Sequence, residues 1–167
     1  MIKKMKLAIL GFGREGKSIL KYLQNRRSTR MGTRINADEI WILDANMNLK
    51  IPRGINTQTG KDYLKNLERF DLVFRSPGIP YTLPRLFRAR CNGLKVSSAT
   101  ILFFEEIRGM VRRGSPQIIG ITGSKGKSLT ATLLYKILKA SGKNVYLAGN
   151  IGTPALDILP SLLRGSE

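Results

Sequence analysis

Short apolar runs alternate with helical patterns along most of this chain. In the apolar runs hydrophobic residues follow one another, as in buried strands, whereas in the helical patterns they recur at three- and four-residue spacing. Strands are predicted at residues 5–10, 39–44, 70–74, 94–97, 118–121 and 145–148. Helices are predicted at residues 18–23, 58–69, 84–91, 99–110, 129–138 and 155–163. This alternation is typical of an α/β fold with a parallel sheet.

A linker divides the pattern into two parts. Residues 112–116, Arg-Arg-Gly-Ser-Pro, combine charge, glycine and proline between two patterned segments. We therefore predict an α/β sheet domain at residues 1–115 and the start of a phosphate-loop domain at residues 116–167. The second domain is expected to be incomplete, because two strand–helix units are too few for such a sheet.

Residues 117–133 carry the most specific motif. The apolar run 118–121 leads into Gly-Ser-Lys-Gly-Lys-Ser at 123–128, and a helical pattern begins at Leu129. In a phosphate loop of this layout, backbone N–H groups and the helix N-terminus face phosphate oxygens, while a lysine and a serine contact the β- and γ-phosphates and Mg²⁺. Lys127 and Ser128 occupy those two positions. Ile121 stands where the motif expects its first glycine, so a simple turn with two exposed lysines stays an alternative.

Three further segments follow predicted strands. Residues 11–16, Gly-Phe-Gly-Arg-Glu-Gly, lie between a strand and a helix, where such glycines form a phosphate-binding turn or a turn that binds nothing. Asp44 ends the next strand, where an acid can accept hydrogen bonds from a ribose or base, or can form a turn with Asn46. Residues 75–80, Arg-Ser-Pro-Gly-Ile-Pro, form a rigid turn after a third strand. Ligands of open α/β sheets bind at this end of the strands.

Composition excludes several classes of function. The net charge of +18 comes from 29 Lys+Arg against 11 Asp+Glu, but no aromatic residues interleave with the arginines of the densest basic stretch, residues 21–34. We therefore expect no specific nucleic-acid binding. The chain has no histidine, which excludes imidazole general-base chemistry and histidine-ligated zinc. The single cysteine, Cys91, excludes an internal disulfide and fits a reducing, cytoplasmic compartment. No apolar run approaches the length of a membrane span.

Four stretches together resemble the amino-terminal part of a Mur ligase of the D-glutamate-adding (MurD) type, which acts in peptidoglycan synthesis. They are residues 11–16, 75–80, 121–128 and 149–154, and their order and spacing match across nearly the whole chain. The last two are specific together, whereas the first alone would not be. The resemblance implies a Rossmann-like first domain that binds the UDP end of UDP-N-acetylmuramoyl-L-alanine. It implies a second, P-loop NTPase-like domain that binds ATP and Mg²⁺.

The resemblance also assigns residues. It places Gly13, Arg14, Glu15, Asp44, Ala45, Ser76, Pro77 and Gly78 around the UDP group. It places Gly123, Ser124, Lys125, Gly126, Lys127, Ser128 and Leu129 around ATP, with Ser128 as the metal ligand. Asn150 matches the asparagine that reaches toward the substrate, so Lys127 and Asn150 are the implied catalytic residues. Lys125 stands where the family has asparagine and adds a charge beside the phosphates.

The family reaction is ATP-driven amide formation. The carboxylate of the UDP-linked L-alanine attacks the γ-phosphate to give an acyl phosphate, and the amine of D-glutamate then displaces phosphate. The family's metal-binding glutamate, histidine, modified lysine and amino-acid domain have no counterpart in these 167 residues. We therefore expect the isolated chain to be a monomer without activity and without a D-glutamate site. Two alternatives are a degenerate remnant that binds a uridine nucleotide, and a dinucleotide-dependent oxidoreductase, which would leave residues 126–128 unexplained.

Overall fold

The computed structural model describes residues 5–25, 39–108 and 116–164. The chain forms two compact units, Met1–Leu102 (unit 1) and Phe103–Glu167 (unit 2). The boundary predicted between residues 115 and 116 adjoins residues 109–115, which lie outside the described part, so it stays a prediction.

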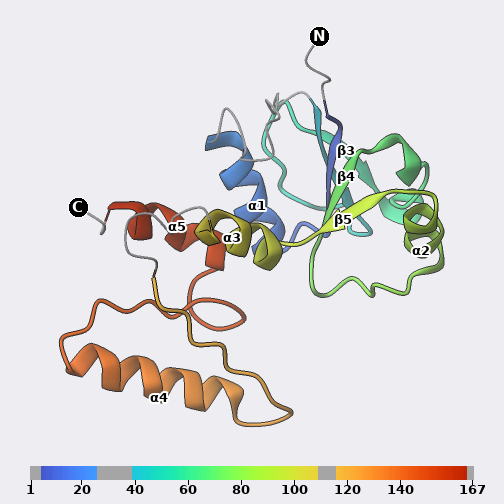
Figure 1. The fold of residues 1–167 in the computed structure, drawn as a ribbon. Helices are drawn as coiled ribbons and strands as arrows, with labels where there is room; N and C mark the ends of the chain where they lie inside the picture. Colours follow the sequence, from blue (N-terminus) through green and yellow to red (C-terminus); the bar gives the residue numbers. More distant parts are fainter. Residues whose placement is uncertain (1–4, 26–38, 109–115, 165–167) are drawn as a thin grey trace. The chain divides into compact units, whose positions relative to one another are not determined.

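Unit 1 is built on a parallel sheet of five strands (Figure 1). The strands are β1 (Leu7–Leu10), β2 (Ile40–Asp44), β3 (Asn56–Thr59), β4 (Leu72–Arg75) and β5 (Lys95–Ser97). Their order in the sheet is β3-β2-β1-β4-β5, with Leu7 of β1 opposite Ile40 of β2 on one side and Leu72 of β4 on the other. The predicted α/β class with a Rossmann-like parallel sheet is therefore confirmed.

Both faces of this sheet are covered, which explains why its strands are continuous apolar runs. Ala8 and Leu10 belong to a buried cluster with residues from the segment before β4 and from α2 (Pro84–Cys91). Helix α1 (Arg14–Asn25) buries Ile19 and Leu23 and packs against β1 and β4. The sheet is thereby held rigidly enough to fix the loops at the ends of its strands.

One predicted helix in unit 1 is wrong. Residues 58–69 form the end of β3 and two 3₁₀ turns, η2 (Gly60–Asp62) and η3 (Leu67–Arg69), rather than a continuous helix. Asn56–Thr59 pairs with β2 as the edge strand of the sheet, and Gly60 then takes a left-handed conformation at φ +78° that interrupts any helix. Strand pairing thus overrides the local preference of this polar stretch.

Unit 2 contains the predicted helices but not the predicted strands. Helix α4 spans Lys127–Ala140 and α5 spans Ala155–Arg164, while α3 (Ala99–Arg108) crosses the division between the units. Residues 118–121 and 145–148 are not strands, and Ala148 forms only an isolated bridge with Thr153. A buried parallel strand needs a hydrogen-bonded neighbour, and the described residues of unit 2 supply none. Across the described parts of both units, no helix is long and apolar enough to cross a membrane.

Candidate functional site

Three of the predicted substrate segments meet at the carboxyl ends of the strands in the unit 1 sheet. Residues 11–16 follow β1, and Ser76–Gly78 follow β4. Asp44 is the last residue of β2, and Ala45 comes directly after it. These strands are neighbours in the order β2-β1-β4. Strands β2 and β3 lie on one side of β1, whereas β4 and β5 lie on its other side, so the strand order reverses between β1 and β4. Such a reversal leaves a crevice at the carboxyl ends of the strands, which is where open α/β sheets bind ligands.

Hydrogen bonds tie the three segments together. The Gly11 amide donates to the Leu43 carbonyl at 2.8 Å, and the Ser76 amide donates to the Leu10 carbonyl at 2.9 Å. The Ser76 hydroxyl donates to the Gly11 carbonyl at 2.6 Å. The glycine turn is thus fixed on both sides before any ligand arrives.

Gly16 is required by close packing between α1 and the turn. A Cβ atom at this position would lie 2.3 Å from the Gly11 carbonyl oxygen and 3.3 Å from the Ile9 side chain. No side chain fits at the first distance without moving backbone. Gly13 is different, because a Cβ atom there would have no neighbour within 4 Å, so its open side is accessible to a ligand.

Asp44 links the glycine turn to the β2 turn. Its Oδ2 accepts a hydrogen bond from the Phe12 amide at 2.7 Å, and its Oδ1 accepts one from the Asn46 amide at 2.8 Å. The turn alternative raised by the sequence is therefore present, since the second bond closes an Asx turn. Each carboxylate oxygen keeps a second lone pair, so a ligand role for Asp44 stays a prediction. Ala45 lies exposed beside it.

Replacing Asp44 with alanine should lower the free energy of unfolding of unit 1 by about 2 kcal/mol, because the buried Phe12 amide would lose a charged acceptor. Asp44→Asn, which keeps one acceptor oxygen, should cost less. Urea unfolding followed by Trp41 fluorescence measures both, since Trp41 is the single tryptophan and lies in β2. Asp62→Ala is the matched control, because its exposed pair with Lys65 should contribute about 0.5 kcal/mol or less. Equal stability of Asp44→Ala and wild type would contradict the bridging role.

Arg75 shapes the third segment, and the sequence interpretation gave it no role. Its guanidinium donates to the Ser76 carbonyl at 3.2 Å and also to the Ile79 carbonyl. The turn therefore wraps around a cation, with Pro77 and Gly78 exposed at its tip. The signal available in the sequence was an arginine directly before a Ser-Pro-Gly turn, whose carbonyls need a donor.

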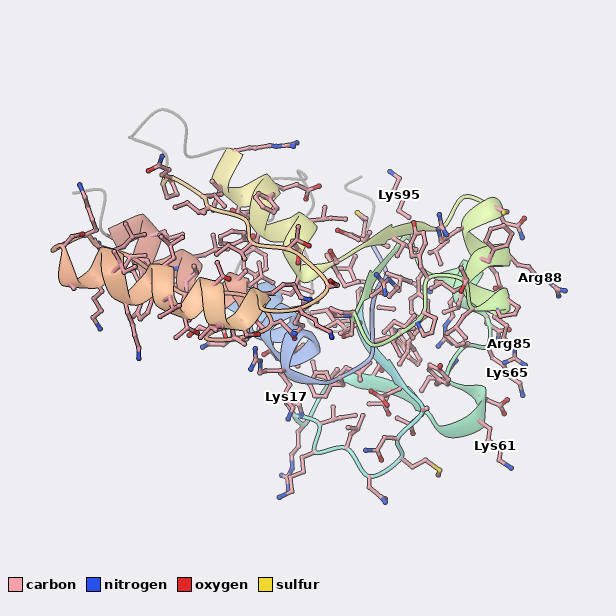
Figure 2. The ribbon with its side chains drawn as sticks, turned by 90° about the horizontal axis from the view of Figure 1, so that it is seen from below. Lys17, Lys61, Lys65, Arg85, Arg88 and Lys95 are labelled. Atoms are coloured by element: carbon pink, nitrogen blue, oxygen red, sulfur yellow. The ribbon has the colours of Figure 1, made fainter. Side chains whose placement is uncertain are left out.

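Glu15 carries an unsatisfied atom at this site. Its Oε2 is buried and has no hydrogen-bond partner among the described residues. A buried acceptor of this kind is rare and is typically met by water or a ligand donor. Its neighbour Arg14 is the first residue of α1 and is exposed. Lys17 projects to solvent from the first turn of the helix (Figure 2). The N-terminus of α1 thus combines two cations with one acceptor that has no partner among the described residues.

The predicted phosphate loop in unit 2 leads directly into helix α4. Gly126 precedes α4 as its N-cap at φ +75°, a left-handed conformation that favours glycine. The Lys127 ammonium donates to the carbonyls of Gly123 and Ser124, so the side chain folds over the loop. The Lys127 side chain therefore lies against its own loop, and its contact with a phosphate stays a prediction.

The remaining residues of the predicted loop offer a hydroxyl group, a cation and an apolar side chain. Ser128 lies in the first turn of α4, and Lys125 is exposed beside it. Residues 116–164 and the other described ranges contain no group of three or more histidine, cysteine or acidic side chains that could hold a metal. A Mg²⁺ ion here would take one oxygen from Ser128 and the rest from phosphates and water, as this ion commonly does. Leu129 is 66% exposed, so it offers apolar surface rather than a polar contact.

Asn150 lies in a tight turn of the same unit. The Gly149 amide donates to the Thr153 carbonyl at 3.0 Å, and the Thr153 amide donates to the Leu147 carbonyl at 3.2 Å. These two bonds close the turn and present Asn150 exposed at its tip. The asparagine is therefore held by backbone bonds rather than by a sheet.

Comparisons with known proteins agree with the four motifs. A UDP-N-acetylmuramoylalanine–D-glutamate ligase of Acetivibrio thermocellus is 36% identical over 159 residues, which cover 93% of this chain. Ligases of the same name from Clostridium tetani and Geobacillus kaustophilus are 34% and 36% identical over 92% of this chain. The resemblance to the amino-terminal portion of a MurD-type Mur ligase is therefore confirmed. A scan against protein-family models found no match.

The similarity to these Mur ligases covers a limited part of the relatives. This chain spans 31% of the length of the Acetivibrio thermocellus and Clostridium tetani ligases and 32% of the Geobacillus kaustophilus ligase. That share agrees with the amino-terminal portion predicted from the motifs.

Proposed function

We propose that the crevice of unit 1 binds the uridine diphosphate end of UDP-N-acetylmuramoyl-L-alanine. The observation that carries this proposal is the hydrogen-bonded convergence of residues 11–16, Asp44 and Ser76 at the point where the strand order reverses. The N-terminus of α1, with Gly13 and Arg14, would face the diphosphate. Asp44 and Ala45 would lie beside the uracil, and Ser76, Pro77 and Gly78 would close the far wall. Glu15 would accept a donor from the ligand through its unpaired oxygen.

Residues 123–129 are proposed as an ATP site. The left-handed Gly126 and the N-terminus of α4 support phosphate binding there. Lys127 would exchange its bonds to the loop carbonyls for bonds to the β- and γ-phosphates. Ser128 would supply one ligand to Mg²⁺, and Lys125 would add positive charge to the rim of the loop.

In the proposed reaction, bound ATP supplies the phosphoryl group that activates the carboxylate of the substrate. Lys127 would stabilise the negative charge that develops during this transfer, and Asn150 would orient the substrate from the turn at 149–154. The amine of D-glutamate would then attack the acyl phosphate, form the amide bond and displace phosphate. No described residue is assigned to bind this amino acid.

We also propose that this chain does not complete the reaction by itself. Helix α4 has no buried residue, and Leu129, Leu133 and Ile137 on one stripe of it are 66%, 50% and 64% exposed. Ile118 and Ile119 before the loop are exposed as well. An apolar surface of this kind needs further polypeptide to pack against, as in the complete sheet of a phosphate-loop domain. The same observation favours the second candidate, a uridine-nucleotide-binding module without ligase activity.

Titration calorimetry with UDP-N-acetylmuramoyl-L-alanine and with Mg-ATP tests these assignments separately. We expect the UDP-sugar to bind unit 1, and we expect no ADP when both ligands and D-glutamate are supplied together. ADP production would contradict the proposed inactivity. Binding of NAD but not of the UDP-sugar would overturn the ligase assignment, and UDP binding without ATP binding would favour the second candidate. The cytoplasmic location, the monomeric state and the domain boundary at residue 115 stay predictions.

A further inference from the structure

A surface hollow on unit 1 is lined by other residues than the crevice described above. Its volume is about 310 Å³, and it is lined by Tyr81, Phe87, Arg90, Cys91, Leu94 and Val96. Phe87 is 53% exposed and Tyr81 is 44% exposed, which is unusual for rings of this size. The hollow therefore presents aromatic surface to solvent beside a guanidinium group.

Backbone hydrogen bonds fix the walls of this hollow. At the end of α2 the Asn92 amide donates to the Arg88 carbonyl at 3.1 Å, and the Leu94 amide donates to the Ala89 carbonyl at 3.0 Å. These bonds turn the chain directly from α2 into β5. Inside the hollow, the Arg90 guanidinium carbon lies 3.6 Å from the centroid of the Tyr81 ring. The pocket is thus preformed and does not need a ligand to order it.

The segment that forms the hollow carries more positive than negative charge. Residues 71–106 contain Arg75, Arg85, Arg88, Arg90 and Lys95 against Asp71, Glu105 and Glu106. Figure 2 shows Arg85 and Arg88 projecting outward on the α2 side, and Lys95 projecting from β5. The neighbouring residues 60–69 carry Lys61, Lys65 and Arg69 against Asp62 and Glu68, so they add no net negative charge. A ligand with negative charge is therefore favoured.

One wall of the hollow is an open edge of the sheet. β5 is the last strand in the order β3-β2-β1-β4-β5, and β4 is its strand partner among the described residues. An edge strand presents backbone N–H and C=O groups with which an extended peptide can pair. Val96 lies in this strand and also lines the hollow, so a paired peptide would place alternate side chains over it.

We propose that β5 and the hollow form a docking site for an extended acidic polypeptide segment that carries one apolar or aromatic side chain. The segment would pair with the free edge of β5, insert its apolar side chain between Tyr81 and Phe87, and place its carboxylates against Arg85, Arg88 and Lys95. This site uses other residues than the proposed UDP crevice, and the Arg75 guanidinium carbon, which lies 5.4 Å from the centroid of the Tyr81 ring, connects it to the Ser76 turn.

Two other anionic partners fit this surface less well. Single-stranded nucleic acid binds through successive uncovered aromatic rings, whereas Arg90 already covers a face of Tyr81. A membrane surface is met by helices with a broad apolar face, whereas α2 turns Leu86 and Ala89 into the core and exposes Phe87 among arginines. Both partners are included as arms of the test.

Fluorescence polarisation of the full chain with a labelled peptide, Asp-Glu-Asp-Val-Phe-Val-Glu-Asp-Glu-Asp, tests the proposal. We expect saturable binding that weakens at least about tenfold when Phe is replaced by Ser in the peptide, because the anchor is lost. The Arg85→Glu/Arg88→Glu variant should also weaken binding at least about tenfold, and Phe87→Ser should do the same. Lys136→Glu/Lys143→Glu on unit 2 makes the same change in net charge at exposed positions and should leave binding unchanged. Urea unfolding of each variant confirms that unit 1 is intact.

Four results would overturn the proposal. They are no binding of the peptide, equal weakening by the unit 2 control variant, no effect of the Phe-to-Ser change in the peptide, and tighter binding of a dT oligonucleotide or of phosphatidylglycerol vesicles than of the peptide. The third result would show that the peptide binds by nonspecific charge attraction alone. The last result would assign the surface to nucleic acid or to lipid.

Discussion

Replacing Gly16 with alanine should lower the free energy of unfolding of unit 1 by about 3 kcal/mol and abolish binding of the UDP-sugar. The added Cβ would lie 2.3 Å from the Gly11 carbonyl oxygen, so α1 or the glycine turn must move. The turn cannot move freely, because the Gly11 amide donates a hydrogen bond to the Leu43 carbonyl and the Gly11 carbonyl accepts one from the Ser76 hydroxyl. Urea unfolding followed by Trp41 fluorescence measures the loss of stability, and calorimetry measures ligand binding.

Gly13→Ala is the matched control for this experiment. A Cβ atom at Gly13 has no neighbour within 4 Å, so the fold should be as stable as wild type to within about 0.5 kcal/mol. Affinity for the UDP-sugar should nevertheless fall, since the methyl group would occupy the side by which a diphosphate approaches the turn. Wild-type stability of Gly16→Ala would contradict the close packing of α1 on the turn. Wild-type affinity of Gly13→Ala would contradict the proposed position of the diphosphate.

The second large effect is expected at Lys127. Lys127→Ala should lower the affinity for Mg-ATP between about 10-fold and 100-fold, because charged hydrogen bonds of this kind contribute about 1.5–3 kcal/mol. The fold should be unaffected, since the side chain is exposed and bonds only to carbonyls of its own loop. Calorimetry with Mg-ATP on the full chain provides the measurement.

Lys136→Ala controls for the loss of one positive charge on α4. Lys136 is exposed in the same helix but lies more than two turns from the loop, so its removal should change ATP affinity less than about twofold. Equal effects of the two variants would indicate that α4 attracts ATP by general charge. ATP affinity unchanged in Lys127→Ala would remove the basis for the proposed site.

Several strands and helices of unit 1 were predicted correctly, because the spacing of their apolar residues is a local signal in the sequence. Ile40–Asp44 and Pro84–Cys91 are examples, because their apolar spacing and the proline at the start of the helix are local signals. β3 was missed, since Asn56–Thr59 is polar and becomes a strand by pairing with β2 at the sheet edge. Residues 118–121 show the opposite error, because an apolar run forms a strand only beside a partner strand.

The sequence alone determined which residue types stand at the ends of the strands: the glycines of 11–16, Asp44, the Ser-Pro-Gly turn and the Lys-Ser pair at 127–128. Such motifs are legible because turns, phosphate loops and acidic strand ends depend on short-range backbone geometry. Only the tertiary structure decided that Asp44 accepts a hydrogen bond from the Phe12 amide, that Arg75 donates to the carbonyls of the next turn, and that one Glu15 oxygen has no partner in the described part of the chain. These contacts depend on the order in which the strands pair, and that order is set by packing across the whole sheet rather than by any local pattern.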